Sequence, residues 1–267
     1  MKYNIFVSDF DGTLVRSDGT VSQKNRAAIK RYTERGGKFV VCSGRMTGAI
    51  LPRVRELALT GLVASYQGMV VSEIATGKVI QTAAFEDSLA YEAVERTAAL
   101  GYHTHVYTAD ELYCNRDDEA LEYYESVCRV KANIVADLAS FARCNRLRII
   151  KIVVMIPKEE RAEAARRMRQ ALPASCAVTC SAEYLVEATP AGKDKGEAVK
   201  FLSEYYNVPL SQIAAIGDMG NDLPMVAAAG GKFAVENAEE ELKAIATIVP
   251  SCEDDGVAAA LDRAMEE

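Results

Sequence analysis

The sequence predicts an α/β protein in which a doubly wound, Rossmann-like parallel sheet is interrupted by an inserted α+β domain. Apolar and amphipathic segments alternate up to Gly68 in the order strand, helix, strand, helix, strand. That alternation is lost over a mixed block of helical and strand patterns, and it resumes after the block. We therefore expect the core at residues 1–83 and 184–267, with the inserted domain at residues 84–183.

The first part of the core carries signals for where its elements end. Ile5–Val7 is a short apolar segment of the kind that is buried in a parallel sheet. Ser22 is a suitable N-cap for a helix that the pair Gly36–Gly37 then stops. Asp18–Gly19 is a favoured turn dipeptide and predicts a small hairpin before that helix. The later elements expected are the strand KFVVCSGR, a helix from Thr47, the strand LVASYQG and a hairpin turned at Thr76–Gly77.

The inserted block and the return of the core are interpreted in the same way. His103 and His105 alternate along a predicted strand and therefore share one face of it. Without a matching cluster of ligands, we interpret them as packing or solvent residues rather than as a metal site. Asn237 suits a cap for a helix at 238–245. The block should hold helices near 86–100, 116–129 and 158–172 and strands HTHVY, ELYC and LRIIKIVVMI, before the core resumes with the helix KGEAVKFLSEYY, the strand IAAIGD, the helix DLPMVAAAG and the strand KFAV.

Composition limits the classes of partner and the compartment. A formal charge of −7 gives no electrostatic reason to expect nucleic acid or an anionic membrane as a partner. The seven cysteines form no C-x-x-C pair, which favours reduced thiols. No signal-peptide segment and no apolar run of membrane-spanning length is visible, so a cytoplasmic protein is expected. The sequence carries no indication of the oligomeric state.

Four polar clusters fall at the ends or starts of core elements. They are Asp9 with Asp11, the segment Ser43–Arg45, the lysines of GKDKG, and the loop GDMGND at 217–222. Each alone is typical of an ordinary turn or a solvated loop. In an open α/β sheet, however, ligands bind beyond the carboxyl ends of the strands, where these clusters would meet. Paired carboxylates favour a cation between them, and hydroxyls, backbone amides and lysine suit a phosphate.

Other phosphate and metal motifs are excluded. Lys193 follows a glycine but precedes Asp194, and the upstream glycine of a Walker A loop is missing. The first predicted strand is not followed by G-x-G-x-x-G. Leu14 stands where an EF-hand loop requires glycine, and Thr20 stands where it requires glutamate. Phosphate handled by carboxylates and a metal therefore fits the clusters best.

In this order, the four clusters resemble the motifs of the haloacid dehalogenase (HAD) superfamily of phosphohydrolases, in its Cof-like branch with an α/β cap domain. DFDGT resembles the first motif, D-x-D-G-T. Ser43, Lys195 and the loop GDMGND are similar to the second, third and fourth motifs. One departure stands at Gln67, where relatives usually carry an asparagine close to the pocket. The resemblance covers nearly the whole chain and is weakest in the cap.

The resemblance implies a mechanism that passes through an aspartyl-phosphate. Asp9 would attack phosphorus, and Asp11 would protonate the leaving oxygen and then activate water. The implied cofactor is Mg²⁺, bound by the Asp9 side chain, the Asp11 backbone carbonyl and Asp218. Asp222 would hold a metal-bound water or orient Lys195. The phosphate-binding groups implied are Ser43, Gly44, Lys195 and Asn221.

The function that the resemblance implies is hydrolysis of a small-molecule phosphate monoester, such as a sugar phosphate, a nucleotide, a flavin precursor or pyridoxal phosphate, with the cap supplying substrate specificity. A phosphomutase or phosphotransferase with the same aspartyl-phosphate is one alternative, and a non-catalytic protein that binds a phosphorylated ligand is another. A receiver-like signalling domain is much shorter and has adjacent acids after its first strand. Arg45 is left open between substrate contact and an ion pair at a helix start.

Overall fold

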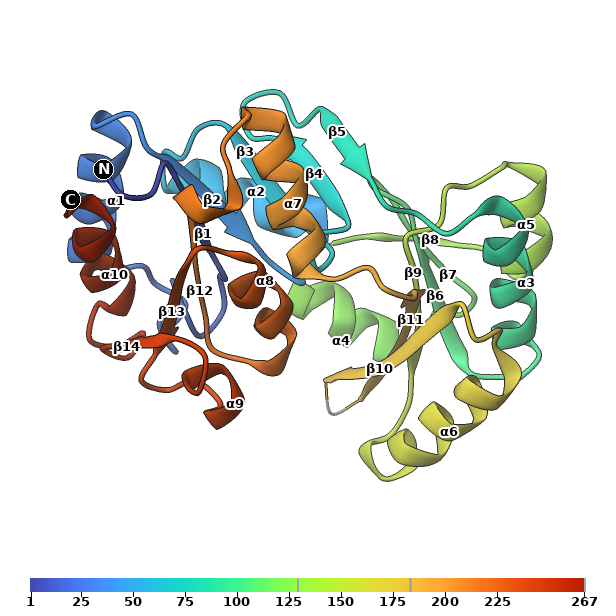
Figure 1. Ribbon diagram of the computed structural model, residues 1–267. Helices are drawn as coiled ribbons and strands as arrows, with labels where there is room; N and C mark the ends of the chain where they lie inside the picture. Colours follow the sequence, from blue (N-terminus) through green and yellow to red (C-terminus); the bar gives the residue numbers. More distant parts are fainter. Residues whose placement is uncertain (129, 183, 267) are drawn as a thin grey trace. The chain divides into compact units, whose positions relative to one another are not determined.

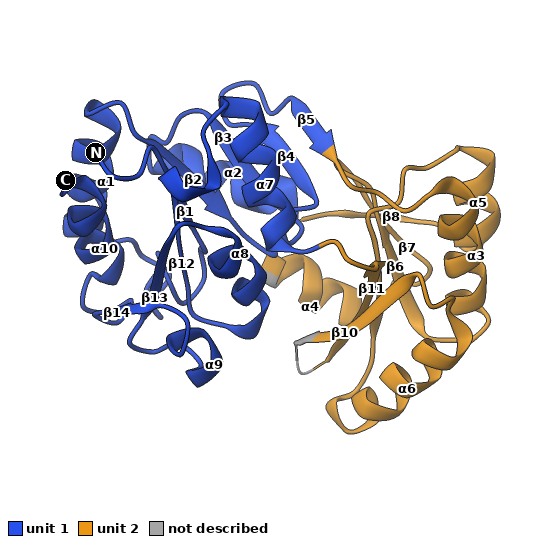
Figure 2. Cartoon of the chain, viewed as in Figure 1, with its two compact units in different colours: residues 1–81, 194–267 blue, residues 82–193 orange. Residues whose placement is uncertain are grey.

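The chain divides into two units, each with its own sheet and apolar core. The computed structural model describes residues 1–128, 130–182 and 184–266. The first unit contains residues 1–81 and 194–267, and the second contains residues 82–193 (Figure 1; Figure 2).

The second unit covers residues 82–193, whereas the bounds predicted from the sequence are 84–183, and residue 183 lies outside the described residues. The physical reason is the strand Leu185–Pro190, which pairs with two strands of the second sheet.

The first unit is built on an eight-stranded sheet with the order β14-β13-β12-β1-β2-β3-β4-β5. Its central strands run parallel, and β4 runs antiparallel to β3. Helix α1 packs against α10, and α7 packs against α8, on opposite faces of the sheet (Figure 1). The strands are β1 (Ile5–Ser8), β2 (Lys38–Cys42), β3 (Leu62–Ser65), β4 (Val70–Glu73), β5 (Val79–Thr82), β12 (Ile213–Gly217), β13 (Gly231–Val235) and β14 (Thr247–Val249). The helices are α1 (Gln23–Glu34), α2 (Thr47–Glu56), α7 (Lys195–Tyr206), α8 (Leu223–Ala228), α9 (Glu240–Lys243) and α10 (Gly256–Met265), with short 3₁₀ turns at Leu210–Gln212 and Gly220–Asp222.

Parallel register brings the carboxyl ends of three central strands to one edge of this sheet. Ser8, the last residue of β1, pairs with the penultimate residues of β12 and β2. The strand side chains hold this register through burial, since Phe6 of β1 is fully buried and stacks on Phe39 of β2 and Phe233 of β13. As a result, Asp9, Ser43 and Asp218 emerge side by side at the edge predicted from the sequence.

Two local expectations for the first unit are wrong. The turn expected at Asp18–Gly19 is present, with the Arg16 N–H donating to the Thr20 carbonyl, but no strands of the described ranges flank it as a hairpin would require, since Leu14 and Val15 donate to the Phe10 carbonyl instead. Asn237 does not cap the short helix α9, whose N-cap is Glu239. Its side-chain amide instead donates to the Gly12 carbonyl and accepts from the Cys252 backbone, which ties two loops together.

The second unit is a six-stranded sheet with the order β10-β11-β9-β6-β7-β8. Helices α3, α5 and α6 cover one face and share an apolar core with it, and α4 lies on the other face (Figure 1). The strands are β6 (His103–Tyr107), β7 (Leu112–Cys114), β8 (Ala132–Ile134), β9 (Lys151–Met155), β10 (Cys176–Ala182) and β11 (Leu185–Pro190). The helices are α3 (Asp87–Ala98), α4 (Glu119–Cys128), α5 (Leu138–Cys144) and α6 (Arg161–Ala171), with a 3₁₀ turn at Lys158–Glu160.

The strand expected over LRIIKIVVMI is shorter than its apolar run. It begins at Lys151, because the preceding Ile149 uses its carbonyl to accept the Phe85 backbone N–H instead of pairing along the sheet. The helix expected to reach residue 129 is described as far as Cys128, since residue 129 lies outside the described range. Within the described ranges, no helix has the length and apolar character needed to cross a membrane.

Candidate active site

Asp9 and Lys195 form the centre of a buried polar cluster in the first unit. Asp9 directly follows β1, and Lys195 is the first residue of α7. The Lys195 ammonium donates to Asp9 Oδ1 at 2.5 Å and to Asp222 Oδ1 at 2.5 Å. Its side chain is only 1% exposed, so these two carboxylates replace the water that would otherwise solvate the charge.

Asp222 holds the loop after β12 as well as the lysine. Its second oxygen, Oδ2, accepts the backbone N–H groups of Asp218 at 2.9 Å and Met219 at 3.1 Å. Both oxygens of this carboxylate are therefore engaged within the protein. Asp222 is fully buried, and this geometry suits a residue that orients Lys195 and the loop.

Asp218 is positioned by two residues of the DFDGT segment. Thr13 donates its hydroxyl to Asp218 Oδ1 at 2.7 Å. Gly12 has φ +82°, and a Cβ atom built there would lie 2.5 Å from Asp218 Oδ2. Glycine is therefore required at position 12 for two reasons, its left-handed backbone conformation and the close approach of the Asp218 carboxylate.

Three buried carboxylates share this cluster with one buried ammonium. Atoms of Asp9, Asp218 and Asp222 that can bind a metal lie within 4.8 Å of one another. Burial raises the pKa of Asp9 well above its usual value against the attraction of Lys195, and burial also raises the pKa of Asp218. For Lys195, burial opposes the charge, but the attraction of Asp9 and Asp222 outweighs it and raises the pKa.

The excess of carboxylates over ammonium groups in this cluster is the observation that fits a bound cation. If all three carboxylates are ionised, the cluster carries two negative charges more than the one lysine neutralises. Close carboxylates with raised pKa values are stabilised by a nearby divalent ion, and oxygen ligands are those that Mg²⁺ prefers. The buried group of Asp9, Asp218 and Asp222 therefore fits a metal site.

Asp11 lies outside the buried cluster and is paired with Arg45. The guanidinium donates from Nε to Asp11 Oδ2 at 2.8 Å and from Nη2 to Oδ1 at 2.7 Å, a two-point ion pair. Both side chains are exposed by nearly half. Of the two readings left open for Arg45, the structure shows the ion pair just before helix α2.

Ser43, Gly44 and Asn221 lie around the side chain of Gln67. Ser43 is buried directly after β2, and its hydroxyl accepts the Arg45 backbone N–H at 3.2 Å. A Cβ atom at Gly44 would lie 2.5 Å from Gln67 Nε2. Asn221 is exposed and donates its amide to Gln67 Oε1 at 3.1 Å. Gln67, the departure noted in the sequence, therefore links the second and fourth motifs.

The structure thus brings together Asp9, Lys195, Asp218 and Asp222 and sets Asp11 and Asn221 at more exposed positions. The contribution of Thr13 was not singled out from the sequence, although the threonine of DFDGT was its signal. Lys193, the other lysine of GKDKG, belongs to the second unit.

Known proteins similar to this chain include phosphatases. A family model described as haloacid dehalogenase-like hydrolase matches residues 6–261. The chain is 28% identical to a 5-amino-6-(5-phospho-D-ribitylamino)uracil phosphatase of Bacillus subtilis, over 96% of each chain. It is 27% identical to the phosphatase YwpJ of the same organism, over 94% of this chain and 95% of that one.

A solved structure extends the likeness to the fold. The crystal structure of TM0651 from Thermotoga maritima has a TM-score of 0.90 and 28% sequence identity to this chain, and the match covers 99% of this chain and 98% of that one. The predicted fold class, a parallel α/β core with a second mixed sheet, is confirmed.

Proposed function

Since the chain belongs to the haloacid dehalogenase-like hydrolases, we propose that it hydrolyses small phosphate monoesters through an aspartyl-phosphate formed on Asp9, with Mg²⁺ as its cofactor. The protein is a phosphatase, a phosphoric monoester hydrolase of this family. The observation that carries the more specific mechanism is the buried cluster of Asp9, Lys195, Asp218 and Asp222.

Asp9 is the nucleophile in this proposal. Its carboxylate attacks phosphorus, the ester oxygen leaves with its electron pair, and the phosphoryl group is carried on an Asp9 oxygen. Lys195 keeps Asp9 oriented through the 2.5 Å hydrogen bond and supplies positive charge beside the attacking oxygen. Ser43, the Gly44 backbone amide and Asn221 are proposed to donate to the oxygens of the transferring phosphoryl group.

Asp11 is proposed as the acid that protonates the leaving oxygen and then as the base that activates water. Water attacks phosphorus in the second step, Asp11 takes its proton, and phosphate leaves from Asp9. The ion pair with Arg45 has to open before Asp11 can take either role. Because both side chains are exposed by nearly half, that opening costs little.

Asp9, Asp218 and the Asp11 backbone carbonyl are the proposed ligands of Mg²⁺, with Asp222 behind them orienting Lys195. A bound Mg²⁺ would supply positive charge that offsets the excess negative charge of the cluster and of the substrate phosphate. Thr13 and Gly12 hold Asp218 in place for this purpose, one by a hydrogen bond and the other by leaving room.

The substrate is proposed to be a small phosphorylated metabolite. One relative is a phosphatase for 5-amino-6-(5-phospho-D-ribitylamino)uracil, a flavin precursor of the class expected from the sequence. At 28% identity the substrate itself does not transfer, so sugar phosphates, nucleotides and pyridoxal phosphate stay among the candidates. Residues of the second unit are proposed to select among them.

The experiment is phosphate release from a panel of these esters and from p-nitrophenyl phosphate, in Mg²⁺ and in EDTA. Asp9→Asn should abolish release, and EDTA should stop it reversibly. Lys200→Gln, which breaks an exposed ion pair on α7, is the control and should keep full activity. A substantial rate in Asp9→Asn reassigns the nucleophile, and full activity in EDTA removes the metal from the mechanism.

A further inference from the structure

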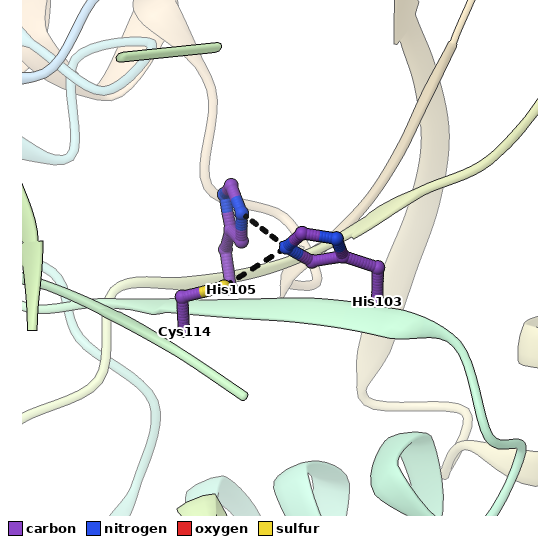
Figure 3. A group of neighbouring side chains, drawn as sticks. All are labelled: His103, His105 and Cys114. Atoms are coloured by element: carbon purple, nitrogen blue, oxygen red, sulfur yellow. Dashed lines mark hydrogen bonds between the residues drawn. The ribbon is translucent and has the colours of Figure 1, made fainter. Parts of the chain in front are cut away.

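The second unit contains a separate cluster of two imidazoles and a thiol. His103 and His105 lie two residues apart on β6 and face the same way, and Cys114 lies on the neighbouring strand β7 (Figure 3). The antiparallel register pairs His105 with Cys114 directly. Contrary to the sequence interpretation, the two histidines therefore have a partner of ligand type, and all three side chains are buried.

The distances in this cluster match those around a tetrahedral metal ion. His103 Nε2 lies 3.2 Å from His105 Nε2 and 2.9 Å from Cys114 Sγ. Zinc–nitrogen bonds of about 2.05 Å and zinc–sulfur bonds of about 2.3 Å at a tetrahedral angle give ligand separations of roughly 3.3 Å and 3.5 Å. The two separations from His103 lie within about 0.6 Å of the tetrahedral values, and all three donor atoms lie within 4.8 Å of one another.

The Nδ1 atom of each imidazole already has a hydrogen-bond partner. His103 Nδ1 lies 3.0 Å from the Asp118 carboxylate, which can only accept a hydrogen bond when it is ionised. His105 Nδ1 lies 3.2 Å from the Tyr107 hydroxyl, which itself donates to Tyr124 at 2.7 Å. With Nδ1 donating in both contacts, the Nε2 atom of each imidazole is left to bind a metal. A carboxylate behind a histidine is the arrangement that orients metal-binding imidazoles in proteins.

This arrangement leaves two Nε2 lone pairs facing each other. The two Nε2 atoms lie 3.2 Å apart with both rings buried, which is close enough for one ion to contact both. Cys114 has its own contacts, to the Arg116 carbonyl at 3.0 Å and to the Arg116 backbone N–H at 3.5 Å. That N–H would stabilise a sulfur carrying negative charge.

We propose that His103 Nε2, His105 Nε2 and Cys114 Sγ bind one divalent zinc-class cation in the second unit. Imidazole and thiolate are ligands that suit zinc, whereas Mg²⁺ prefers oxygen. Binding releases the Cys114 thiol proton to solvent and changes the protonation of neither histidine. The site is separate from the carboxylate cluster of the first unit and shares no residue with it.

A cavity of about 530 Å³ provides access to this site. His103 and Asp118 line it together with Tyr123, Met155 and Tyr184, all from the second unit. The deeper ligands His105 and Cys114 are fully buried, so the ion enters past His103. A water molecule from this cavity completes the fourth position.

Metal binding to the full-length chain tests the proposal. Chelator-treated protein is titrated with Co²⁺, which replaces zinc and gives visible bands and a thiolate charge-transfer band that carboxylate sites do not produce. Zn²⁺ affinity is measured by competition with a chromophoric chelator. We expect one equivalent of thiolate-bound cobalt, displaced by Zn²⁺ and not by Mg²⁺.

Four variants locate the site. Cys114→Ser should lose the charge-transfer band, and Asp118→Asn should keep the band but weaken Zn²⁺ binding about 10–100-fold, since it holds His103 from outside. Cys144→Ser, at an exposed cysteine of the same unit, is the control and should behave as the parent protein. Circular dichroism verifies the folding of each variant, and His105→Gln repeats the test if Cys114→Ser does not fold. No charge-transfer band in the parent, or a band that survives both Cys114→Ser and His105→Gln, overturns the proposal.

Discussion

Replacing Gly12 by alanine would place a methyl group where the Asp218 carboxylate now lies. The built Cβ atom is 2.5 Å from Asp218 Oδ2, and ordinary contacts begin at 3.4 Å, so the carboxylate has to move by about 1 Å. Gly19 offers a matched control. Its φ of +80° is nearly the same as the +82° of Gly12, but nothing lies within 4 Å of its Cβ position.

The comparison of these two variants separates backbone strain from displacement of the carboxylate. Alanine in a left-handed conformation costs about 1–2 kcal/mol at either position. At Gly12 the shift also weakens the hydrogen bond from Thr13 to Asp218, which adds up to about 1.5–3 kcal/mol because the acceptor is charged. A misplacement of about 1 Å at a reacting centre costs on the order of 100-fold in rate.

Two assays measure these effects. Urea denaturation gives the free energy of unfolding, which should fall in both variants and further in Gly12→Ala. Phosphate release against Mg²⁺ concentration gives activity and metal affinity, which should be weakened in Gly12→Ala alone. If Gly12→Ala binds Mg²⁺ and turns over as well as Gly19→Ala does, the argument that Gly12 exists to admit Asp218 is refuted.

Three further predictions concern the same unit. Asp11→Asn should slow hydrolysis of alkyl phosphates far more than that of p-nitrophenyl phosphate, whose leaving group needs no proton. The control is Asp262→Asn, because Asp262 forms an ion pair with an arginine that is equally exposed and has the same 2.7 Å separation. Equal losses of activity on both esters would contradict the acid role of Asp11. Lys195→Met leaves two carboxylates buried without their ammonium, so it should lower the free energy of unfolding in metal-free buffer by about 3–5 kcal/mol. Mg²⁺ should restore part of that stability. An unchanged urea midpoint would contradict the stabilising role of Lys195. Gln67→Ala removes the acceptor of the Asn221 amide and should raise KM by about 2–10-fold while kcat stays nearly the same. A loss confined to kcat would instead assign Gln67 to the chemical step.

The edge at which the site assembles could be predicted from the sequence because it depends on a general property of parallel sheets. Strands of similar length that run in the same direction end at the same edge, so polar residues after Ser8, Cys42 and Gly217 had to meet. Lys195 was included through its motif, although it is far from Asp9 in the chain. Helix α1 was also predictable, because Ser22 caps it as expected and accepts the Asn25 N–H.

Contacts that depend on side-chain direction and strand register could not be predicted. The alternation of His103 and His105 is visible in the sequence, but their meeting with Cys114 requires the register of β6 against β7. The pairing of Asp11 with Arg45 likewise depends on how two loops turn after their strands. The strand β8 and the helix α5 were missed because each is short and has little periodicity of its own.

The order of strands in the first sheet has a consequence for synthesis on the ribosome. β1 lies between β2 and β12, and β12 is encoded after the whole of the second unit. At ordinary translation rates, one edge of β1 therefore waits on the order of ten seconds for its partner. The second unit is continuous in sequence and can complete its own sheet during that interval. The unit that starts the chain is thus the one that finishes folding last, and its unpaired β1 edge is where a nascent-chain chaperone would be needed.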